Sequence, residues 1–406
     1  MSSEEWKHLP LEDCMDAIID YRGKTPRKSS FGIPLITAKI VKDGRILEPT
    51  EFIPCEDYDE RMQRGIPKAG DVVITTEGPL GEVGQLDNRK LSVGQRIITL
   101  RGKTDLLDNT YLKYHLMSTH VQEQLLSRET GTTVTGIKQS ELRKVKLKVP
   151  PLPTQHRIAE ILSSLDDKIE LNRQTNATLE AIAQAIFKEW FVDFNYPGAT
   201  GERVDSKFGP IPKGWKVSNL GNEGEFKNGI NYSRDEPGDY AFSIVNVRNI
   251  VGNRFVILSD LDKVNIDTKK AAPYKLSIQD IIIARSASPG VAAILYEPTN
   301  DTIFSGFTIR YRINLIENVM FIFLLFQSMK EKLADLANGT TLKSINQVSL
   351  KSVQIVIPEK ETLEEFSAIV RSIYDKIFRN QLESELLSHI RDLLLPELMS
   401  NGLKLR

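Results

Sequence analysis

Basic and hydroxyl-bearing side chains gather in one short stretch near the start of the chain, DYRGKTPRKSS (20–30). Glycine, proline and serine at this density are typical of a loop. Such a loop can contact the phosphate oxygens of a nucleic acid, and an arginine can donate two hydrogen bonds to a guanine. An ordinary solvated loop would have the same composition, and the sequence leaves both interpretations open. The nucleic-acid contacts that we predict here are Arg22, Lys24, Thr25, Arg27 and Lys28.

Other side chains suited to phosphates or base edges occur along both halves of the chain. In the first half they are Lys39, Gln95, Arg96 and Lys138. In the second half, FKNGINYSRDEPGDY (226–240) contributes asparagines, which pair well with the edge of adenine. The contacts that we predict in the second half are Lys227, Asn228, Asn231, Tyr232, Arg234, Asn246, Arg248, Arg285, Ser286 and Lys343.

Familiar catalytic sequence motifs are missing from the chain. The tripeptide GKT occurs at 23–25 and 102–104, but Ile18 and Ile97 stand where a phosphate-binding loop needs its first glycine. There is no NPP motif of an amino-methyltransferase and no Pro-Asp motif of a common restriction nuclease. The five histidines have no zinc-binding spacing. We therefore expect a non-catalytic chain with no metal or cofactor of its own.

The composition is that of an ordinary globular protein. The 406 residues are 40% hydrophobic and 26% charged, with a net charge of −1, and suffice for two or three domains. Cys14 and Cys55 are the only cysteines, which fits a reducing cytoplasm. The longest apolar run, VMFIFLLF (319–326), is too short to span a bilayer. Because the net charge is near zero, any nucleic-acid binding depends on local clusters and a basic partner.

An internal repeat organises the sequence. GTTVTGIKQSEL (131–142) and GTTLKSINQVSL (339–350) are identical at six of twelve positions. GDVVITTEGPLGEVG (70–84) aligns with QDIIIARSASPGVAA (279–293), which pairs Asp71 with Asp280 and Thr76 with Arg285. A retained frame with changed side chains predicts two blocks of similar fold and different binding preference.

A long helical pattern follows each block, beginning near Thr154 and Thr362, which we expect to be N-caps. Apolar residues recur at heptad spacing, which predicts that the two helices pair as an antiparallel coiled coil. Packing of each helix on its own block is the alternative. Pro396 should end or kink the second helix. The predicted seam and partner-interface residues are Ile158, Leu162, Leu165, Ile169, Asn172, Asn176, Leu179, Ile186, Trp190, Phe366, Ile373, Ile377, Asn380, Leu387 and Leu394.

Polar residues interrupt both seams at matching depths, with Asn172 and Asn176 in the first and Asn380 and Ser384 in the second. In an antiparallel pair these layers would meet and fix the register. Bulky aromatics, Phe187, Trp190 and Phe191, end the first helix; they suit packing in the coiled coil and domain, or a docking face for a partner.

The predicted architecture is α+β, with two globular α/β domains held apart by a rod of two long helices. Its segments are a first domain at 1–150, a helix at 151–198, a second domain at 199–358 and a distal helix at 359–406.

Several stretches resemble the specificity subunit of type I restriction–modification enzymes. They are DYRGKTPRKSSFGIPLITAKIVKDG (20–44), GDVVITTEGPLGEVG (70–84), GTTVTGIKQSEL (131–142), VPPLPTQHRIAEILSSLDDKIELNRQTNATLEAIAQAIFKEWFVDF (149–194) and GPIPKGWKVSNLG (209–221). The resemblance covers essentially the whole chain, although IPEKETLEEF (357–366) lacks the PPLPTQ-type entry to the helix.

The resemblance implies two target-recognition domains, each reading one half of a split, asymmetric sequence in double-stranded DNA. The coiled coil would set the gap between the halves and dock DNA methyltransferase subunits, of which we expect two. A restriction and translocase subunit would complete the assembly. The resemblance also implies that this chain is non-catalytic: S-adenosylmethionine would bind the methyltransferase subunits, and ATP and Mg²⁺ the restriction subunit. The location would be the nucleoid region of a bacterial or archaeal cytoplasm.

Two other interpretations stay open on the sequence alone. One is a coiled-coil scaffold that joins partner proteins without reading DNA, for which the basic loop RGKTPRK would have no purpose. The other is a self-contained methyltransferase or nuclease, which the missing motifs argue against.

Overall fold

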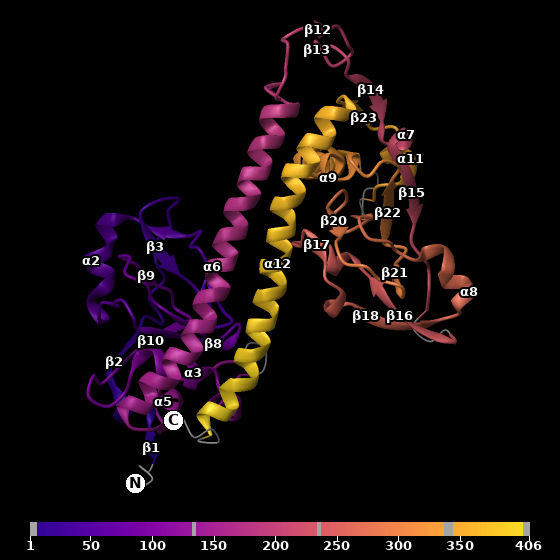
Figure 1. Cartoon of the computed structure of the whole chain (residues 1–406). Coiled ribbons are helices and arrows are strands. Elements are labelled where there is room, and N and C mark those ends of the chain that lie inside the picture. Colours follow the sequence, from indigo (N-terminus) through magenta and orange to yellow (C-terminus); the bar gives the residue numbers. More distant parts are fainter. Residues whose placement is uncertain (1–5, 132–134, 234–236, 337–343, 401–406) are drawn as a thin grey trace. The chain divides into compact units, whose positions relative to one another are not determined.

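The computed structural model describes residues 6–131, 135–233, 237–336 and 344–400 (Figure 1). The chain divides into two compact units, Met1–Leu171 with Glu383–Arg406, and Asn172–Leu382. Two 40-residue helices, α6 (Leu152–Phe191) and α12 (Lys360–Met399), each contribute to both units. Each unit therefore combines a mixed α/β domain with part of each long helix, and the predicted α+β architecture is confirmed.

The first unit is built on a four-stranded antiparallel sheet in the order β2-β10-β7-β8. A small sheet, β6-β3-β9, and the pairs β4-β5 and β1-β11 complete it. Its strands are β1 (Lys7–Pro10), β2 (Met15–Asp20), β3 (Ile33–Ile36), β4 (Val41–Lys42), β5 (Arg45–Ile46), β6 (Phe52–Ile53), β7 (Val72–Thr76), β8 (Leu80–Gln85), β9 (Ser92–Val93), β10 (Ile97–Gly102) and β11 (Lys146–Val149). Its shorter helices are α1 (Leu11–Cys14), α2 (Tyr58–Arg61), α3 (Asn109–Met117), α4 (Thr119–Ser127) and α5 (Gln139–Leu142).

The second unit repeats this plan with a five-stranded sheet in the order β15-β22-β19-β20-β17. A smaller sheet, β18-β16-β21, and the pairs β14-β23 and β12-β13 accompany it. Its strands are β12 (Arg203–Val204), β13 (Ile211–Pro212), β14 (Lys216–Asn219), β15 (Gly224–Asn228), β16 (Tyr240–Val245), β17 (Phe255–Val256), β18 (Asp262–Ile266), β19 (Ile281–Ala284), β20 (Ala292–Leu295), β21 (Thr302–Phe304), β22 (Thr308–Ile313) and β23 (Gln354–Ile357). Its shorter helices are α7 (Leu220–Glu223), α8 (Thr268–Ala271), α9 (Asn318–Ser328), α10 (Lys330–Asp335) and α11 (Gln347–Lys351).

One buried ion pair occupies the same place in both sheets. Arg101 donates to Asp71 at 2.7 Å, and Arg312 donates to Asp280 at 2.6 Å, with both carboxylates almost fully buried. Asp71 directly precedes β7, and Arg101 lies on β10, which pairs with β7. In the same way, Asp280 directly precedes β19, and Arg312 lies on β22, which pairs with β19. The internal repeat that aligns Asp71 with Asp280 is therefore confirmed in three dimensions.

Both long helices depart from the predicted ends. Helix α6 begins at Leu152, so Thr154 lies inside it and is not an N-cap, and Thr362 likewise lies inside α12. Pro153 lies in the first turn of α6. Proline is tolerated there because its missing amide hydrogen would have no helical partner in a first turn. Pro396 does not end α12, which runs on to Met399. The last two residues of the helix, Leu398 and Met399, are buried in the core of the first unit. This burial offsets the one backbone hydrogen bond lost at the proline.

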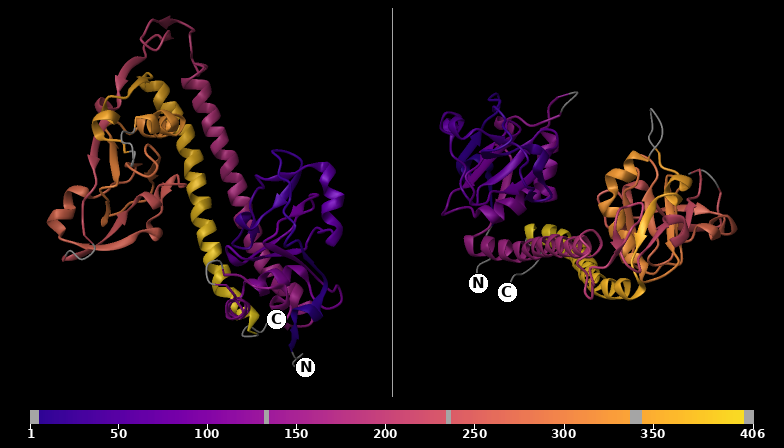
Figure 2. Two further views of the ribbon diagram at one scale, coloured as in Figure 1. Left: turned by 180° about the vertical axis from the view of Figure 1, so that it is seen from behind. Right: turned by 90° about the horizontal axis from the view of Figure 1, so that it is seen from above.

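In the second unit α6 and α12 run antiparallel (Figures 1 and 2). Phe366 near the start of α12 packs on Phe191 near the end of α6, with ring centroids 4.6 Å apart. Farther along, Asn172 and Asn176 of α6 meet Asn380 and Ile377 of α12. The polar layers thus meet as an antiparallel pair requires.

The predicted seam positions are all buried or half-buried within their own units. The fully buried ones are Ile158, Leu162, Ile169, Asn172, Trp190, Phe366, Ile377 and Asn380. The half-buried ones are Leu165, Asn176, Leu179, Ile186, Ile373, Leu387 and Leu394. Several belong to the hydrophobic cores of the domains, so pairing of the helices and packing on the domains occur together.

The asparagine layer yields a prediction for stability. Asn380 Nδ2 donates to Asn176 Oδ1 at 2.8 Å, and Asn176 Nδ2 donates to the carbonyl of Ile377 at 3.1 Å. Replacing Asn380 by leucine should lower the free energy of unfolding by about 1–3 kcal/mol, because Asn176 Oδ1 loses its donor. The Asn176→Leu/Asn380→Leu double variant should lose clearly less than the two single variants added together. Urea unfolding of the four chains measures this coupling, and strict additivity would contradict it.

The longest apolar run of the sequence lies in α9, an 11-residue helix that is largely buried within the second unit. None of the helices described here is both long and apolar enough to cross a membrane.

Candidate nucleic-acid interface

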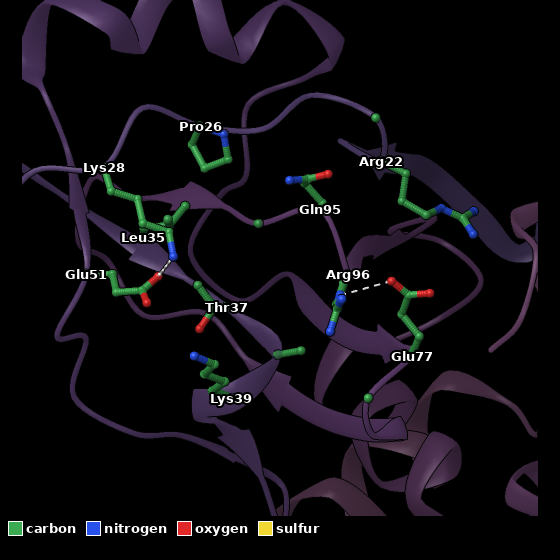
Figure 3. Close-up of a pocket in the computed structure, with 14 residues that line it drawn as sticks. Arg22, Pro26, Lys28, Leu35, Thr37, Lys39, Glu51, Glu77, Gln95 and Arg96 are labelled. Carbon is green, nitrogen blue, oxygen red and sulfur yellow. Dashed lines mark ion pairs between the residues drawn. The ribbon is translucent and has the colours of Figure 1, made fainter. Parts of the chain in front are cut away.

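A cleft of about 470 Å³ opens at one end of the main sheet of the first unit (Figure 3). Residues after β2, residues after β7 and residues just before β10 line it, together with the 3-10 helix Ala38–Ile40. The pairing of β2 and β7 with β10 brings these segments together although they are far apart in sequence. Five predicted contact residues line the cleft: Arg22, Lys28, Lys39, Gln95 and Arg96.

The charges in the cleft are only partly neutralised. Lys28 pairs with Glu51 at 2.8 Å, and Arg96 pairs with Glu77 at 3.0 Å. Lys39 is exposed and has no ion pair or side-chain hydrogen bond among the described residues. Four basic and two acidic side chains line the cleft, and because Arg22 pairs with Asp20 beside it, the charge left over is that of Lys39, which suits a polyanion.

Arg22 lines the cleft, but its guanidinium mainly stabilises the surrounding loops. Its guanidinium donates to the Asp20 carboxylate through Nε at 2.9 Å and Nη2 at 2.7 Å, and through Nη1 to the carbonyl of Ile137 at 2.9 Å. In Figure 3 it points away from the other labelled side chains. Because these donors are already used, Arg22 is better suited to positioning the loop than to contacting DNA.

The rest of the basic loop faces a neighbouring hollow. Lys24, Thr25 and Arg27 line it, and Arg27 is paired there with Asp57 at 2.9 Å and with Glu56 at 2.8 Å. These hydrogen bonds raise the pKa of the Arg27 guanidinium. Thr25 links the two hollows, because its hydroxyl accepts a hydrogen bond from Gln95 at 2.9 Å. The predicted contact Lys138 is exposed at the start of α5 and does not line either hollow.

Two arginines that the sequence reasoning missed brace this loop from behind. Arg61 is buried and donates to the Lys24 carbonyl at 2.9 Å, the Val93 carbonyl at 2.6 Å and the Ser92 hydroxyl at 2.9 Å. Burial lowers the pKa of its guanidinium. Arg64 donates to the Arg22 carbonyl at 2.9 Å. No sequence signal marked either residue, because their partners, mostly backbone carbonyls, lie far along the chain.

In the second unit the equivalent sheet end is formed after β15, after β19 and just before β22. It presents Asn231 and Arg285, which are predicted contacts, and Phe307, which is not. Arg285 donates to the Gly306 carbonyl at 3.4 Å, and Ser286 forms a β-bridge beside it with Ser344.

Other predicted contacts of the second unit have structural partners. Asn246 and Asn249 form a reciprocal capping box around a 3-10 helix, Val247–Asn249. Arg248 in that helix pairs with Asp262 at 2.9 Å and with Asp260 at 3.5 Å. These contacts make the loop rigid and occupy donors that DNA would need.

The remaining candidates lie around β15. Lys227 Nζ lies 5.2 Å from the centre of the Tyr274 ring, and Tyr232 packs partly buried against a small core. Asn228 is exposed at the end of β15. Arg234 and Lys343 lie outside the described residues.

The aromatic residues at the end of α6 are packing residues. Phe187 and Trp190 are buried in the core of the second unit, and Phe191 is half-buried against it. Their rings contact Phe366 and Phe321, which agrees with the packing interpretation, and a docking role for the same helix end stays a prediction. Among the described residues, no group of three or more His, Cys, Asp or Glu side chains could hold a metal ion.

Comparison with known proteins agrees with this duplicated plan. Residues 3–181 and 212–388 match the family model of the type I restriction modification DNA specificity domain. The chain is 29% identical over 414 residues to the MjaIX type I restriction enzyme specificity subunit of Methanocaldococcus jannaschii, covering 99% of this chain and 94% of that relative. It is 25% identical over 442 residues to the HindI specificity subunit of Haemophilus influenzae, covering 89% and 93%.

A solved structure has the same fold. The crystal structure of the S subunit of a type I restriction–modification system from M. genitalium matches with a TM-score of 0.64 and 15% identity, over 98% of this chain and 97% of that chain. With the family model matched over both halves, the chain belongs to the type I restriction modification DNA specificity family and carries its domain twice.

Proposed function

We propose that this chain is the specificity subunit of a type I restriction–modification complex, in which each domain reads one half of a bipartite, asymmetric DNA target. The observation that carries the proposal is that both domains have the same backbone arrangement at one end of the main sheet but present different side chains there. Where the first domain places Arg96, the second places Phe307. A pure scaffold protein gives no reason for such a change at matched, exposed positions.

The equivalence of Arg96 and Phe307 rests on matched hydrogen bonds. The amide of Thr76 donates to the carbonyl of Arg96 at 2.9 Å, and the amide of Arg285 donates to the carbonyl of Phe307 at 2.9 Å. Fixed backbone geometry with variable side chains is how a recognition surface can acquire a new base preference without refolding.

The two long helices set the distance between the half-sites in this proposal. An antiparallel pair with a polar layer resists sliding, so a given helix length fixes one spacer length. The same helices offer docking surfaces for two DNA methyltransferase subunits. S-adenosylmethionine is bound by those subunits, ATP and Mg²⁺ by a restriction and translocase subunit, and this chain carries no catalysis. The assembly acts on DNA in the cytoplasm.

The test begins with co-purification of the chain with the neighbouring methyltransferase subunit and single-molecule sequencing of methylated host DNA. We expect adenine methylation in one split, asymmetric motif that disappears when this chain is deleted. Exchanging residues 199–358 for the corresponding block of a relative with another target should replace one half of the motif and leave the other half and the spacer unchanged. A stable complex whose loss leaves methylation unchanged would favour the scaffold interpretation.

A further inference from the structure

An exposed phenylalanine stands at the recognition end of the second domain. The Phe307 side chain is 66% exposed and directly precedes β22. Its position matches that of Arg96, which directly precedes β10 and lines the positive cleft of the first domain. Where the first domain presents a guanidinium, the second presents an apolar ring.

Polar groups surround this part of the second domain. The Asn231 carboxamide lies over the neighbouring Gly306, where a Cβ atom would approach Asn231 Oδ1 to 2.1 Å. Arg285 donates to the carbonyl of the same glycine. Gly306 thus leaves room for the Asn231 carboxamide, and an amide and a guanidinium lie at the strand end that carries Phe307.

The exposure of Phe307 sets it apart from most of the phenylalanines described in its unit. Other phenylalanines of this unit, such as Phe304 and Phe321, are buried in hydrophobic cores, where removing the apolar side chain from water lowers the free energy. An apolar ring on a DNA-facing surface can gain the same free energy from an apolar group of the DNA. In the major groove that group is the C5-methyl of thymine.

We propose that Phe307 contacts the C5-methyl group of a thymine in the half-site read by the second domain, and so helps to set its base preference. This inference rests on the proposed function above. Loss of one buried methyl group corresponds to about a fourfold loss of affinity. The expected effect is therefore small but confined to one base pair.

Uracil-substituted DNA tests the proposal, because uracil differs from thymine only by this methyl group. The purified complex with its methyltransferase subunits is titrated with duplexes of the mapped target in which single thymines are replaced by uracil. We expect about a fourfold loss at one position of the second half-site. Phe307→Ala should bind the normal target more weakly and lose all sensitivity to uracil at that position, and Phe307→Leu should keep part of it.

Ile278→Ala is the matched control. Ile278 is an exposed apolar residue, 50% exposed, that lies before β19 and so at the opposite end of that strand from Arg285. This variant should bind as the unmodified complex does and keep its sensitivity to uracil.

Three results would overturn the proposal. They are a second half-site without thymine in either strand, no uracil effect on the unmodified complex, or an equal uracil effect on Phe307→Ala. Weaker binding of Phe307→Ala without any uracil effect would instead indicate a ring inserted between base pairs. A complex that binds its mapped target no better than random DNA would contradict the proposed function itself, and is recognised before any uracil is introduced.

Discussion

Replacing Asp166 by alanine should lower the free energy of unfolding by about 3–5 kcal/mol, because buried Lys113 loses its anion and Arg391 keeps only the exposed Asp392. Within the first unit the Asp166 carboxylate accepts hydrogen bonds from Lys113 Nζ at 2.8 Å, Tyr114 Oη at 2.7 Å and Arg391 Nη1 at 2.9 Å. All of these side chains are largely shielded from water. This one carboxylate connects α3, α6 and α12.

Chemical denaturation of the full chain, with hydrogen exchange followed on peptides of α3, measures the effect. Arg157→Ala is the control, since Arg157 and its partner Glu160 form an exposed pair on the same helix, and its loss should change stability by less than about 1 kcal/mol. A change of similar size in both variants would contradict a special role for Asp166.

The dependence of this effect on pH follows from the direction of the pKa shift. Burial by itself raises the pKa of the Asp166 carboxyl, but Lys113, Tyr114 and Arg391 outweigh burial and hold the pKa below its ordinary value of 3.8. The carboxylate therefore stabilises the folded state fully above about pH 4, and this contribution falls as pH drops through the lower, folded-state pKa. An Asp166→Asn chain should show the same loss of stability at pH 7 and pH 5. The difference from the parent chain should shrink only in stronger acid.

The second unit uses different chemistry at the matching helix position, where Tyr374 stands. Tyr374 packs edge-on against Phe323 of α9 and Phe255 of β17. The periodic pattern of the helices predicted the neighbouring seam positions Leu165 and Ile373, because periodicity depends on local sequence, but it included neither Asp166 nor Tyr374. The pattern could not predict an ionic junction in one unit and an aromatic junction in the other, because their partners come from distant segments.

The same limit applies to the candidate interface. The basic loop was recognisable from composition, but its partners Asp20, Asp57 and Glu51 decide which cations remain available. Arg22 and Arg27 are engaged by neighbouring carboxylates, whereas Lys39 is not. Phe307 escaped prediction because a phenylalanine beside a strand is usually a core residue, and only the fold shows its exposure.

Replacing Arg96 by alanine should weaken binding of the assembled complex to its mapped target by about 1–3 kcal/mol, or roughly 5- to 150-fold. Arg96 is the exposed arginine of the first-domain cleft, and among the described residues its guanidinium pairs with Glu77 alone. Bidentate contact with a guanine edge would account for a loss confined to one position of the first half-site. Glu77→Gln should act in the opposite direction, because it releases Arg96 from its ion pair and removes a negative charge from the cleft.

Lys39→Ala should behave differently from Arg96→Ala, since an unpaired lysine in a cleft suits a phosphate contact. Binding should weaken about equally for target and random DNA, and the slope of log K against log salt should fall in magnitude by about one. Arg89→Ala is the charge-matched control, because Arg89 is paired with Asp87 and Glu48 and does not line the cleft. Titrations at several salt concentrations with the target and its single-base variants separate the two roles. If Arg96→Ala kept full discrimination at every position of the first half-site, the cleft would hold the DNA backbone and the bases would be read elsewhere in the domain.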